Sequence, residues 1–327
     1  MKVIIPMAGK GTRLRPHTHT RPKPLMFIAG KPMLGHILDS IKDYQISEVI
    51  FVISGFEDVI RDYVKKYKFK SSFVHQKEAL GPAHAIWQTR DFFKCIDEEI
   101  LIIYADTIFE TDMNVLKKPE ENIIWVKEVK DPRRFGVVIL KNGNIINLEE
   151  KAEKPKSNLA ITGMYFLKSS KLFFKALDYV IENNLREKGE FYINTVLIKM
   201  MKEGEIFIPK TLNVWLDCGT PETVLTTNQY LLKKNHKDYS KPKKSIIVEP
   251  VYIGKNSIIK NSIIGPYVSI GDDTHIENSI IKNSIINNNA HIQDTQIKDS
   301  LIGFNTEVKG TMKIINIGDD SKISYKE

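Results

Sequence analysis

A short glycine-containing turn directly after the first apolar segment carries the strongest chemical signal in the chain. Val3–Ile5 is followed at once by Gly9–Arg13, with the sequence GKGTR. Two glycines let the backbone approach a ligand closely, with N–H groups directed at an anion. A second cation, Lys23, stands between two prolines that stiffen the chain around it. Together these residues predict a site for a phosphate-bearing ligand.

Two common phosphate-binding motifs do not fit this turn. A dinucleotide-binding fingerprint requires a third glycine at the position that Leu14 occupies. A P-loop requires Ser or Thr directly after its lysine, whereas Gly11 follows Lys10. The turn therefore indicates a different class of phosphate-binding protein.

Two aspartates each follow an apolar segment of the kind that forms a buried strand. Asp106 ends the run Ile100–Ala105, and Asp217 follows Val214–Leu216. Ligands of open α/β sheets bind beyond the carboxyl ends of the strands, so both carboxylates are expected at the sheet edge that faces the ligand. Mg²⁺ takes one or two carboxylates, with phosphate oxygens and water completing its coordination. A magnesium-assisted phosphate chemistry fits this pair.

Residues 1–232 alternate short β-branched runs with longer amphipathic segments. The expected strands are Val3–Ile5, Glu48–Ser54, Ile100–Ala105 and Ile123–Val126. The expected helices are Met33–Tyr44, Glu57–Tyr67, Pro82–Phe93 and Ser169–Asn183. This alternation predicts an α/β catalytic domain with a Rossmann-like, mostly parallel sheet and helices on both faces.

Residues 245–327 follow a different pattern, in which an aliphatic residue recurs every five or six positions. The recurring residues are Ile253, Ile258, Ile264, Ile270, Ile276, Ile281, Ile286, Ile292, Ile297, Ile302 and Val308. Repetition at a fixed short period indicates a solenoid. A six-residue period suits one flat side of a triangular parallel β-helix, and these positions predict about four coils. This half resembles the left-handed β-helix of hexapeptide-repeat proteins.

Length and charge limit the classes of protein to which the chain can belong. The 327 residues carry a formal net charge of +8, and no apolar run is long enough to span a membrane. Residues 233–244 hold six lysines and one aspartate, and we interpret them as a basic linker. Since no long basic face interleaved with aromatic residues is evident, neither nucleic acid nor a membrane is expected as a partner. Two cysteines are too few for a disulfide framework, which favours a cytoplasmic location.

The combination of G-x-G-T-R at residues 9–13 with P-K-P-L at residues 22–25 resembles the signature of the sugar-1-phosphate nucleotidylyltransferases. The chain is most similar to long-form glucose-1-phosphate thymidylyl- or uridylyltransferases, which carry a hexapeptide-repeat tail. The resemblance implies transfer of a nucleoside monophosphate from dTTP or UTP to a sugar 1-phosphate, most simply glucose 1-phosphate, with release of pyrophosphate. Arg13 is then assigned to the β- and γ-phosphates and Lys23 to the α-phosphate and the incoming sugar phosphate. Asp106 and Asp217 become ligands of Mg²⁺.

The same resemblance implies two groups of binding residues. Those expected to bind the nucleotide are Ala8, Gly9, Gly11, Thr12, Arg13, Gln76 and Gly81. Those expected to bind the sugar phosphate are Gly136, Glu150, Lys151, Gly163 and Lys188. A glutamine amide offers one acceptor and one donor, complementary to the imide N–H and a carbonyl of uracil or thymine, which favours UTP or dTTP. Lys188 stands where thymidylyltransferases often carry arginine, so the hexose is left open.

Two other functions remain open from the sequence. A hexapeptide-repeat acyltransferase activity, alone or as a second activity, would use His275 or His291 as a base. A non-catalytic regulatory homologue would keep the fold and lose the catalytic residues, whereas Arg13, Lys23 and both aspartates are present. The expected partners are small-molecule substrates and further copies of the chain, in a homo-oligomer that we expect to be a trimer or tetramer.

Overall fold

The computed structural model describes residues 1–9, 11–117, 119–234, 242 and 244–310. Contacts between Cα atoms divide the chain into two compact units. The first comprises Met1–Met26 and Lys31–Thr227, and the second comprises Phe27–Gly30 with the described residues from Asn228 onward. The domain limits at 232 and 244 stay a prediction, since residues 235–241 and 243 of the predicted linker lie outside the described part. Residues 311–327 of the predicted β-helix lie outside it as well.

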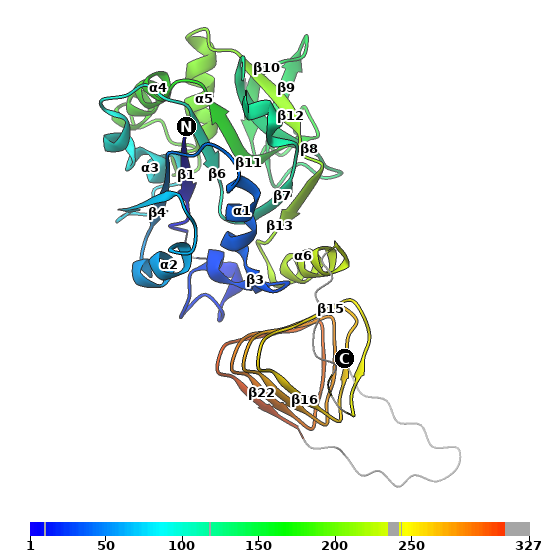
Figure 1. Cartoon of the computed structure of the whole chain (residues 1–327). Helices are drawn as coiled ribbons and strands as arrows, with labels where there is room; N and C mark the ends of the chain where they lie inside the picture. Colours follow the sequence, from blue (N-terminus) through cyan, green and yellow to red (C-terminus); the bar gives the residue numbers. More distant parts are fainter. Residues whose placement is uncertain (10, 118, 235–241, 243, 311–327) are drawn as a thin grey trace. The chain divides into compact units, whose positions relative to one another are not determined.

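The first unit is built on a sheet whose described part has nine strands (Figure 1). They are β1 (Lys2–Pro6), β4 (Glu48–Ile53), β5 (Lys70–His75), β6 (Ile100–Ile103), β8 (Asn122–Glu128), β9 (Gly136–Lys141), β10 (Asn144–Glu150), β11 (Leu159–Leu167) and β12 (Phe207–Thr211). The order β6-β1-β4-β5 is parallel throughout, which confirms the Rossmann-like arrangement and three of the expected strands, and the fourth expected strand is β8. An antiparallel part extends the sheet, because β11 pairs antiparallel with β6, β8 and β9.

Helices cover both faces of this sheet, because alternate residues of each strand point to opposite sides. Val3 and Ile5 of β1 belong to a core that includes α1 (Met33–Ile41) and α2 (Glu57–Val64). Ile4, between them, belongs to a second core that includes α3 (Pro82–Trp87), α4 (Ser170–Glu182) and α5 (Ile193–Lys202). The four expected helices are confirmed with shorter ends, whereas α5 was not expected. No helix in the described ranges is both long and apolar enough to cross a membrane.

A separate antiparallel ribbon joins β7 (Thr107–Glu110) to β13 (Val214–Asp217), with Thr107 opposite Asp217. The expectation that Asp217 ends a strand of the main sheet is therefore wrong. The ribbon nevertheless brings the two aspartates close together, because β7 begins one residue after Asp106. The N–H of Cys218 donates to the main-chain carbonyl of Asp106 at 3.1 Å, which holds the two strand ends side by side.

The second unit contains a triangular parallel β-helix, drawn from yellow to orange in Figure 1. Its described strands form three four-stranded parallel sheets, one for each side. The strands are β14 (Ile246–Ile247), β15 (Val251–Ile253), β16 (Ile258–Lys260), β17 (Ile263–Ile264), β18 (Val268–Ile270), β19 (His275–Glu277), β20 (Ile280–Lys282), β21 (Ile285–Ile286), β22 (His291–Gln293), β23 (Gln296–Lys298), β24 (Leu301–Ile302) and β25 (Glu307–Lys309). This is the predicted left-handed parallel β-helix.

One predicted interior position of the β-helix is wrong by a single residue. Ile258 was expected to point inward, but its side chain is 43% exposed and the buried residue is Ile259. Neighbouring residues of a strand point to opposite sides, so a slip of one residue exchanges the inner and outer faces. The five-residue steps in this part of the repeat make either isoleucine a plausible interior residue from sequence alone.

The second unit also includes a segment from near the N-terminus. Phe27–Gly30 contains β2 (Phe27–Ile28), which is followed by β3 (Lys31–Pro32). The Ala29 N–H donates to the amide oxygen of Asn228 on α6 (Pro221–Lys234) at 3.0 Å. That buried oxygen also accepts from the hydroxyl of Ser269 at 2.6 Å, and its amide nitrogen donates to the Tyr267 carbonyl at 3.3 Å. One asparagine thus joins three segments that are far apart in the sequence.

Candidate active site

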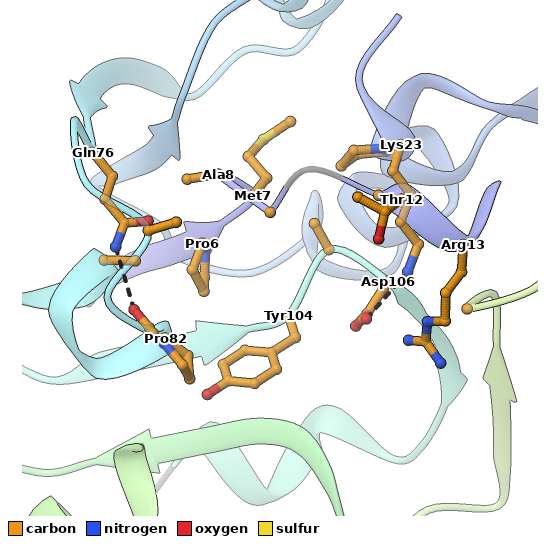
Figure 2. Close-up of a pocket in the computed structure, with 18 of the residues that line it drawn as sticks. Pro6, Met7, Ala8, Thr12, Arg13, Lys23, Gln76, Pro82, Tyr104 and Asp106 are labelled. Carbon is orange, nitrogen blue, oxygen red and sulfur yellow. Dashed lines mark hydrogen bonds and ion pairs between the residues drawn. The ribbon is translucent and has the colours of Figure 1, made fainter. Parts of the chain in front are cut away.

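A cavity of about 500 Å³ lies in the first unit, at the carboxyl end of β1 (Figure 2). It is lined by Pro6, Met7, Ala8, Gly9, Gly11, Thr12, Arg13, Lys23, Pro24, Gln76, Ala79, Gly81, Pro82, Ala85, Tyr104, Ala105, Asp106, Glu190 and Gly219. Every residue that we expected to bind the nucleotide is in this set, together with Lys23 and Asp106. The structure therefore gathers residues from five separate parts of the chain around one space.

The glycine turn has the geometry that its sequence suggested. Gly11 has a φ of +59°, in the left-handed region that favours glycine. A Cβ added there would lie 3.1 Å from the Thr18 side chain and 3.2 Å from the Cβ of Lys23. The Thr18 hydroxyl donates to the Gly11 carbonyl at 2.9 Å. Glycine at this position lets the turn close against the segment that carries Lys23, while residue 10 lies outside the described part.

Lys23 and Asp106 form an ion pair on the wall of the cavity. The Lys23 Nζ lies 3.2 Å from Oδ2 of Asp106 (Figure 2). The Lys23 side chain is only 12% exposed, whereas that of Asp106 is 43% exposed. Pro22 precedes the short 3₁₀ turn Lys23–Leu25, which fixes the lysine near the start of the turn. A ligand entering the cavity can therefore reach both charges.

Asp217 and Arg13 both lie beside Gly219, which lines the cavity together with Arg13, whereas Asp217 is not among the lining residues. A Cβ placed on Gly219 would lie 3.1 Å from a carboxylate oxygen of Asp217 and 3.2 Å from a guanidinium nitrogen of Arg13. Burial and the nearby charge of Asp106 raise the pKa of Asp217, while Lys23 and Arg13 oppose the shift. The repulsion between the two carboxylates shows that the fold holds them within electrostatic reach of each other.

The donor set suits a hard divalent cation. Two neighbouring carboxylates supply oxygen ligands and negative charge, which is what Mg²⁺ selects. Within the described ranges no three His, Cys, Asp or Glu side chains converge on one point. A magnesium ion at Asp106 and Asp217 would therefore complete its coordination with phosphate oxygens and water. The pair fits a metal that acts together with a phosphate substrate better than one held by protein alone.

The opposite end of the cavity is formed by Gln76 and the start of α3. Gly81 has a φ of +105°, and a Cβ there would lie 2.7 Å from the carbonyl oxygen and 2.8 Å from the nitrogen of Phe191. The Phe191 backbone is held in place, since its N–H donates to the Leu80 carbonyl at 2.8 Å. Pro82 is the first residue of the helix, as its type predicts. The neighbouring wall is apolar, with Pro6, Met7, Ala79 and Ala85.

The expected sugar-phosphate residues form a second group around Glu150. Glu150 lies opposite Gly136 in the pairing of β9 with β10, and a Cβ on Gly136 would lie 2.8 Å from its carboxylate. The Nζ of Lys151 is 3.4 Å from the same carboxylate, and the Lys188 ammonium donates to the Lys151 carbonyl at 3.1 Å. Asn194 donates to Glu150 at 2.6 Å. Four of the five expected residues are thus brought together.

Of the two neighbouring glutamates, the structure places Glu150 and not Glu149 in the group of expected sugar-phosphate residues. Glu149 accepts from the Lys156 N–H at 3.1 Å and pairs with the Lys156 ammonium at 3.5 Å, away from the group around Glu150. Burial raises the pKa of Glu150, with Lys151 opposing the shift. Glu150 is therefore the glutamate available to a ligand at this group.

The fifth expected sugar residue, Gly163, supports the cavity from behind. Its φ is +82°, and a Cβ there would lie 3.0 Å from the Tyr104 ring. Its carbonyl accepts from the Tyr104 N–H at 2.9 Å. None of the five expected sugar residues lines the cavity in the described chain, whereas Tyr104 and Glu190 do. Glu190 contacts the nucleotide end, since its Cβ would lie 3.0 Å from a Cβ on Gly81.

Several residues of the site gave no usable signal in the sequence. Asn194 is a buried polar residue on an unexpected helix, and Tyr104 follows an apolar run that could have continued as strand. His84 hydrogen-bonds Gln76 from outside the cavity lining and carries no motif. A buried polar side chain on an apolar face is the one pattern that could have indicated Asn194.

Comparison with known proteins agrees with this geometry. Residues 2–234 match the model of the family described as nucleotidyl transferase. The chain is 37% identical over 265 residues to the bifunctional protein GlmU of Methanocaldococcus jannaschii, covering 81% of this chain and 61% of that protein. It is 28% identical over 322 residues to a glucose-1-phosphate thymidylyltransferase of Streptomyces griseus, covering 89% and 88% of the two chains.

A solved structure from Bacillus anthracis, described as a candidate glucose-1-phosphate thymidylyltransferase in complex with a sucrose, is also similar. It has a TM-score of 0.62 and 26% identity, over 74% of this chain and 98% of that one. The chain thus belongs to the nucleotidyl transferase family, which confirms the expected family and class of enzyme. It spans less than two thirds of the length of the GlmU relative.

Proposed function

We propose that this chain transfers a nucleoside monophosphate from UTP or dTTP to a sugar 1-phosphate, with glucose 1-phosphate as the first candidate. One observation carries the proposal. Arg13, Lys23 and Asp106 line one end of a cavity, with Asp217 beside the lining residue Gly219, and the other end holds a buried glutamine and a close-packed glycine turn. Two cations and two acids at one end, with an apolar wall at the other, match a triphosphate attached to a base.

The reaction requires positioning and charge neutralisation more than covalent catalysis. An oxygen of the sugar phosphate forms a bond to the α-phosphorus while the bond to the bridging oxygen of pyrophosphate breaks. Lys23, nearly buried in the cavity wall, is placed to hold the α-phosphate and the attacking phosphate together. Arg13, exposed beside Gly219, is placed to stabilise the charge that accumulates on pyrophosphate. Mg²⁺ bound by Asp106 and Asp217 would neutralise phosphate charge.

The sugar is expected to contact the group around Glu150. The ionised Glu150 carboxylate would accept hydrogen bonds from hydroxyls, and Lys151 would hold the sugar phosphate. Gly136 leaves room for the ring, since any side chain there would meet Glu150 and Asn194. Lys188 braces Lys151 through its carbonyl.

A pyrophosphate-release assay tests the proposal directly. The full chain with Mg²⁺ is assayed with five nucleoside triphosphates against a panel of sugar 1-phosphates, and UTP or dTTP should give the highest kcat/KM. Lys23→Ala should lower kcat by about 100-fold or more, because a preorganised charge is lost. Lys141→Ala, at an exposed lysine of β9, is the matched control and should retain activity. Absence of pyrophosphate with every substrate pair would overturn the proposal.

Acyl transfer by the β-helix is the alternative activity. The exposed rings of His275 and His291 lie on neighbouring coils with their centroids 4.9 Å apart. An acetyl-CoA assay with an amino-sugar phosphate tests this activity. If one of the two rings acts as the base, the alanine variant of that histidine, His275→Ala or His291→Ala, should abolish turnover.

Three further expectations stay predictions. The chain is expected to form a trimer or tetramer of identical copies, which light scattering can measure. Its partners are expected to be small-molecule substrates and neither nucleic acid nor a membrane. A cytoplasmic location is expected from its two cysteines, both of which are free.

A further inference from the structure

The amide of Gln76 uses both of its N–H groups within the protein. The side chain is only 7% exposed. Its Nε2 lies 3.3 Å from the carbonyl oxygen of Gly81 and 3.1 Å from Nδ1 of His84. Two donors thus meet two acceptors, and only the amide oxygen remains for a ligand. Figure 2 shows the nitrogen of Gln76 joined to the neighbouring carbonyl, with the oxygen on the other side of the amide.

This arrangement changes what a base can recognise in Gln76. The sequence suggested that the amide would offer one acceptor and one donor. In the structure the donor side is already occupied, so a base edge that faces Gln76 must itself donate. Turning the amide over would break both hydrogen bonds and bring Oε1 against two acceptors, Gly81 O and His84 Nδ1.

The tautomer of His84 follows from its neighbours. Its Nε2 lies 3.1 Å from the amide nitrogen of Gln88, so both ring nitrogens face an amide. A neutral imidazole has one N–H and one lone pair. The Gly81 carbonyl, a second acceptor for Gln76 at 3.3 Å, supports the same orientation of this amide, whereas Gln88 has no second side-chain hydrogen bond among the described residues. His84 therefore accepts at Nδ1 and donates from Nε2 to the oxygen of a turned Gln88 amide.

Aromatic packing holds the His84 ring in this position. The ring stacks on Trp87 with a centroid distance of 5.9 Å and on Phe191 at 6.3 Å, both nearly parallel. Phe191 is the residue whose backbone also contacts Gly81. The ring and the Gly81 turn are thus held by the same packing, so the two acceptors that face Gln76 keep a fixed spacing.

Burial favours the neutral ring. It lowers the pKa of His84, while the Glu78 charge and a hydrogen bond with the Glu78 main chain oppose this shift and Arg186 reinforces it. Arg186 lies over the Phe191 ring at 4.6 Å, and Arg90 lies over the Trp87 ring at 4.1 Å. Asp178 accepts from the indole N–H of Trp87 at 2.7 Å. The lowered pKa therefore favours the neutral ring, in which one nitrogen keeps a lone pair.

We propose that His84 is a positioning residue that fixes Gln76 as a pure acceptor, and that it thereby selects uracil and thymine nucleotides over cytosine nucleotides. Uracil and thymine carry a donor at N3, whereas cytosine carries a lone pair there. The inference rests on the proposed nucleotidyl transfer. It adds a residue outside the cavity lining that determines which base the cavity accepts.

The test compares UTP with CTP, which share size, sugar and triphosphate. His84→Leu removes the nearer of the two acceptors and leaves only the longer Gly81 contact to orient the amide, so it should narrow the UTP-over-CTP ratio in kcat/KM by about tenfold or more. The change should come mainly from the KM for CTP, with kcat for UTP and the KM for the sugar phosphate unchanged. His84→Asn places an amide oxygen where Nδ1 was and should keep the ratio within about threefold of the original. Gln88→Leu is the control on the other ring nitrogen and should also keep it.

A second test measures the UTP-over-CTP ratio in kcat/KM of the unaltered chain as a function of pH, and so does not depend on the folding of a variant. Protonation of Nδ1 turns His84 into a donor, which can no longer accept from Gln76 and favours the amide with its oxygen toward the ring. Because the pKa of His84 is lowered, the UTP-over-CTP ratio should fall only at a pH below the titration range of an ordinary histidine, and it should stay flat in His84→Asn. Because both nucleotides are measured at the same pH, titration of the triphosphate cancels.

The outcomes separate this inference from the proposed function. An unchanged ratio in His84→Leu, or a pH-independent ratio in the unaltered chain, would overturn the role of His84 while leaving nucleotidyl transfer intact. If no substrate pair gives pyrophosphate, the proposed function fails, and calorimetric titration of UTP and CTP into the same three variants still decides the role of His84. Equal affinity changes for both nucleotides would count against it.

Discussion

At the scale of single residues, the Lys23–Asp106 pair is suited to exchange its partners when substrate arrives. The Lys23 side chain is 12% exposed and that of Asp106 is 43% exposed, so water and an incoming ligand reach the carboxylate more easily than the lysine. A bound substrate can replace both partners, with phosphate at the lysine and a cation at the carboxylate. Asp217, more buried and with a raised pKa, gains more from a bound cation than Asp106 does.

Asp106→Asn and Asp217→Asn should each lower kcat by about 100-fold or more, because an amide keeps the shape and loses the charge that binds the metal. Both variants should keep the circular dichroism spectrum of the unaltered chain. Asp43→Asn, at an exposed aspartate after α1, is the matched control and should retain full turnover. Full turnover in both site variants would refute the metal assignment.

Glu150 gives the site a pH dependence on its sugar side. Because burial raises its pKa, the carboxylate becomes protonated at a higher pH than an ordinary glutamate as the solution is acidified. The protonated form is a poorer acceptor for hydroxyls, so the KM for the sugar phosphate should rise as the pH falls through this pKa. Glu150→Gln should have a raised KM for the sugar phosphate at neutral pH. The ratio of this KM to that of the unaltered chain should approach one at acid pH. A constant ratio would exclude a role for the charge.

At the scale of elements, Gly81 lets the start of α3 pack against the backbone of Phe191. Gly204, after α5, is a comparison that separates the cost of backbone strain from the cost of a steric collision. Both have φ near +100°, but a Cβ on Gly204 meets nothing within 4 Å. Gly204→Ala should therefore cost only backbone strain, about 1 kcal/mol of unfolding free energy. Gly81→Ala adds a collision with backbone atoms and should cost about 2–4 kcal/mol and raise the KM for the nucleotide. Equal losses in urea unfolding would contradict the close contact.

The elements also show why sequence predicts some features and misses others. The parallel strands and their helices were predictable, because β-branched runs and amphipathic periods are local signals. The place of Asp217 was not, since the partner of β13 is set by tertiary pairing with β7 and not by the residues of β13. His84 was missed for a similar reason, because its role depends on the orientation of one amide.

At the scale of the whole molecule, the chain crosses between its two units more than once. Phe27–Gly30 belongs to the second unit, although it begins four residues after Lys23 and is followed directly by β3 and then α1. No compositional break marks this segment, so a division of the sequence into consecutive domains cannot find it. Asn228 stabilises the arrangement with the Ala29 N–H, the Tyr267 carbonyl and the Ser269 hydroxyl.

Asn228→Ala should therefore destabilise the second unit by about 3 kcal/mol, because it leaves buried donors and an acceptor without partners. Asn147→Ala, at an exposed asparagine of β10, should change stability by less than about 0.5 kcal/mol. Urea unfolding followed by circular dichroism gives both values.

Ser269→Ala should lower the free energy of unfolding less in the Asn228→Ala background than alone, because the hydrogen bond that the two residues share is already lost. The expected coupling is about 1 kcal/mol. Strict additivity of the two substitutions would show that this asparagine does not join the segments.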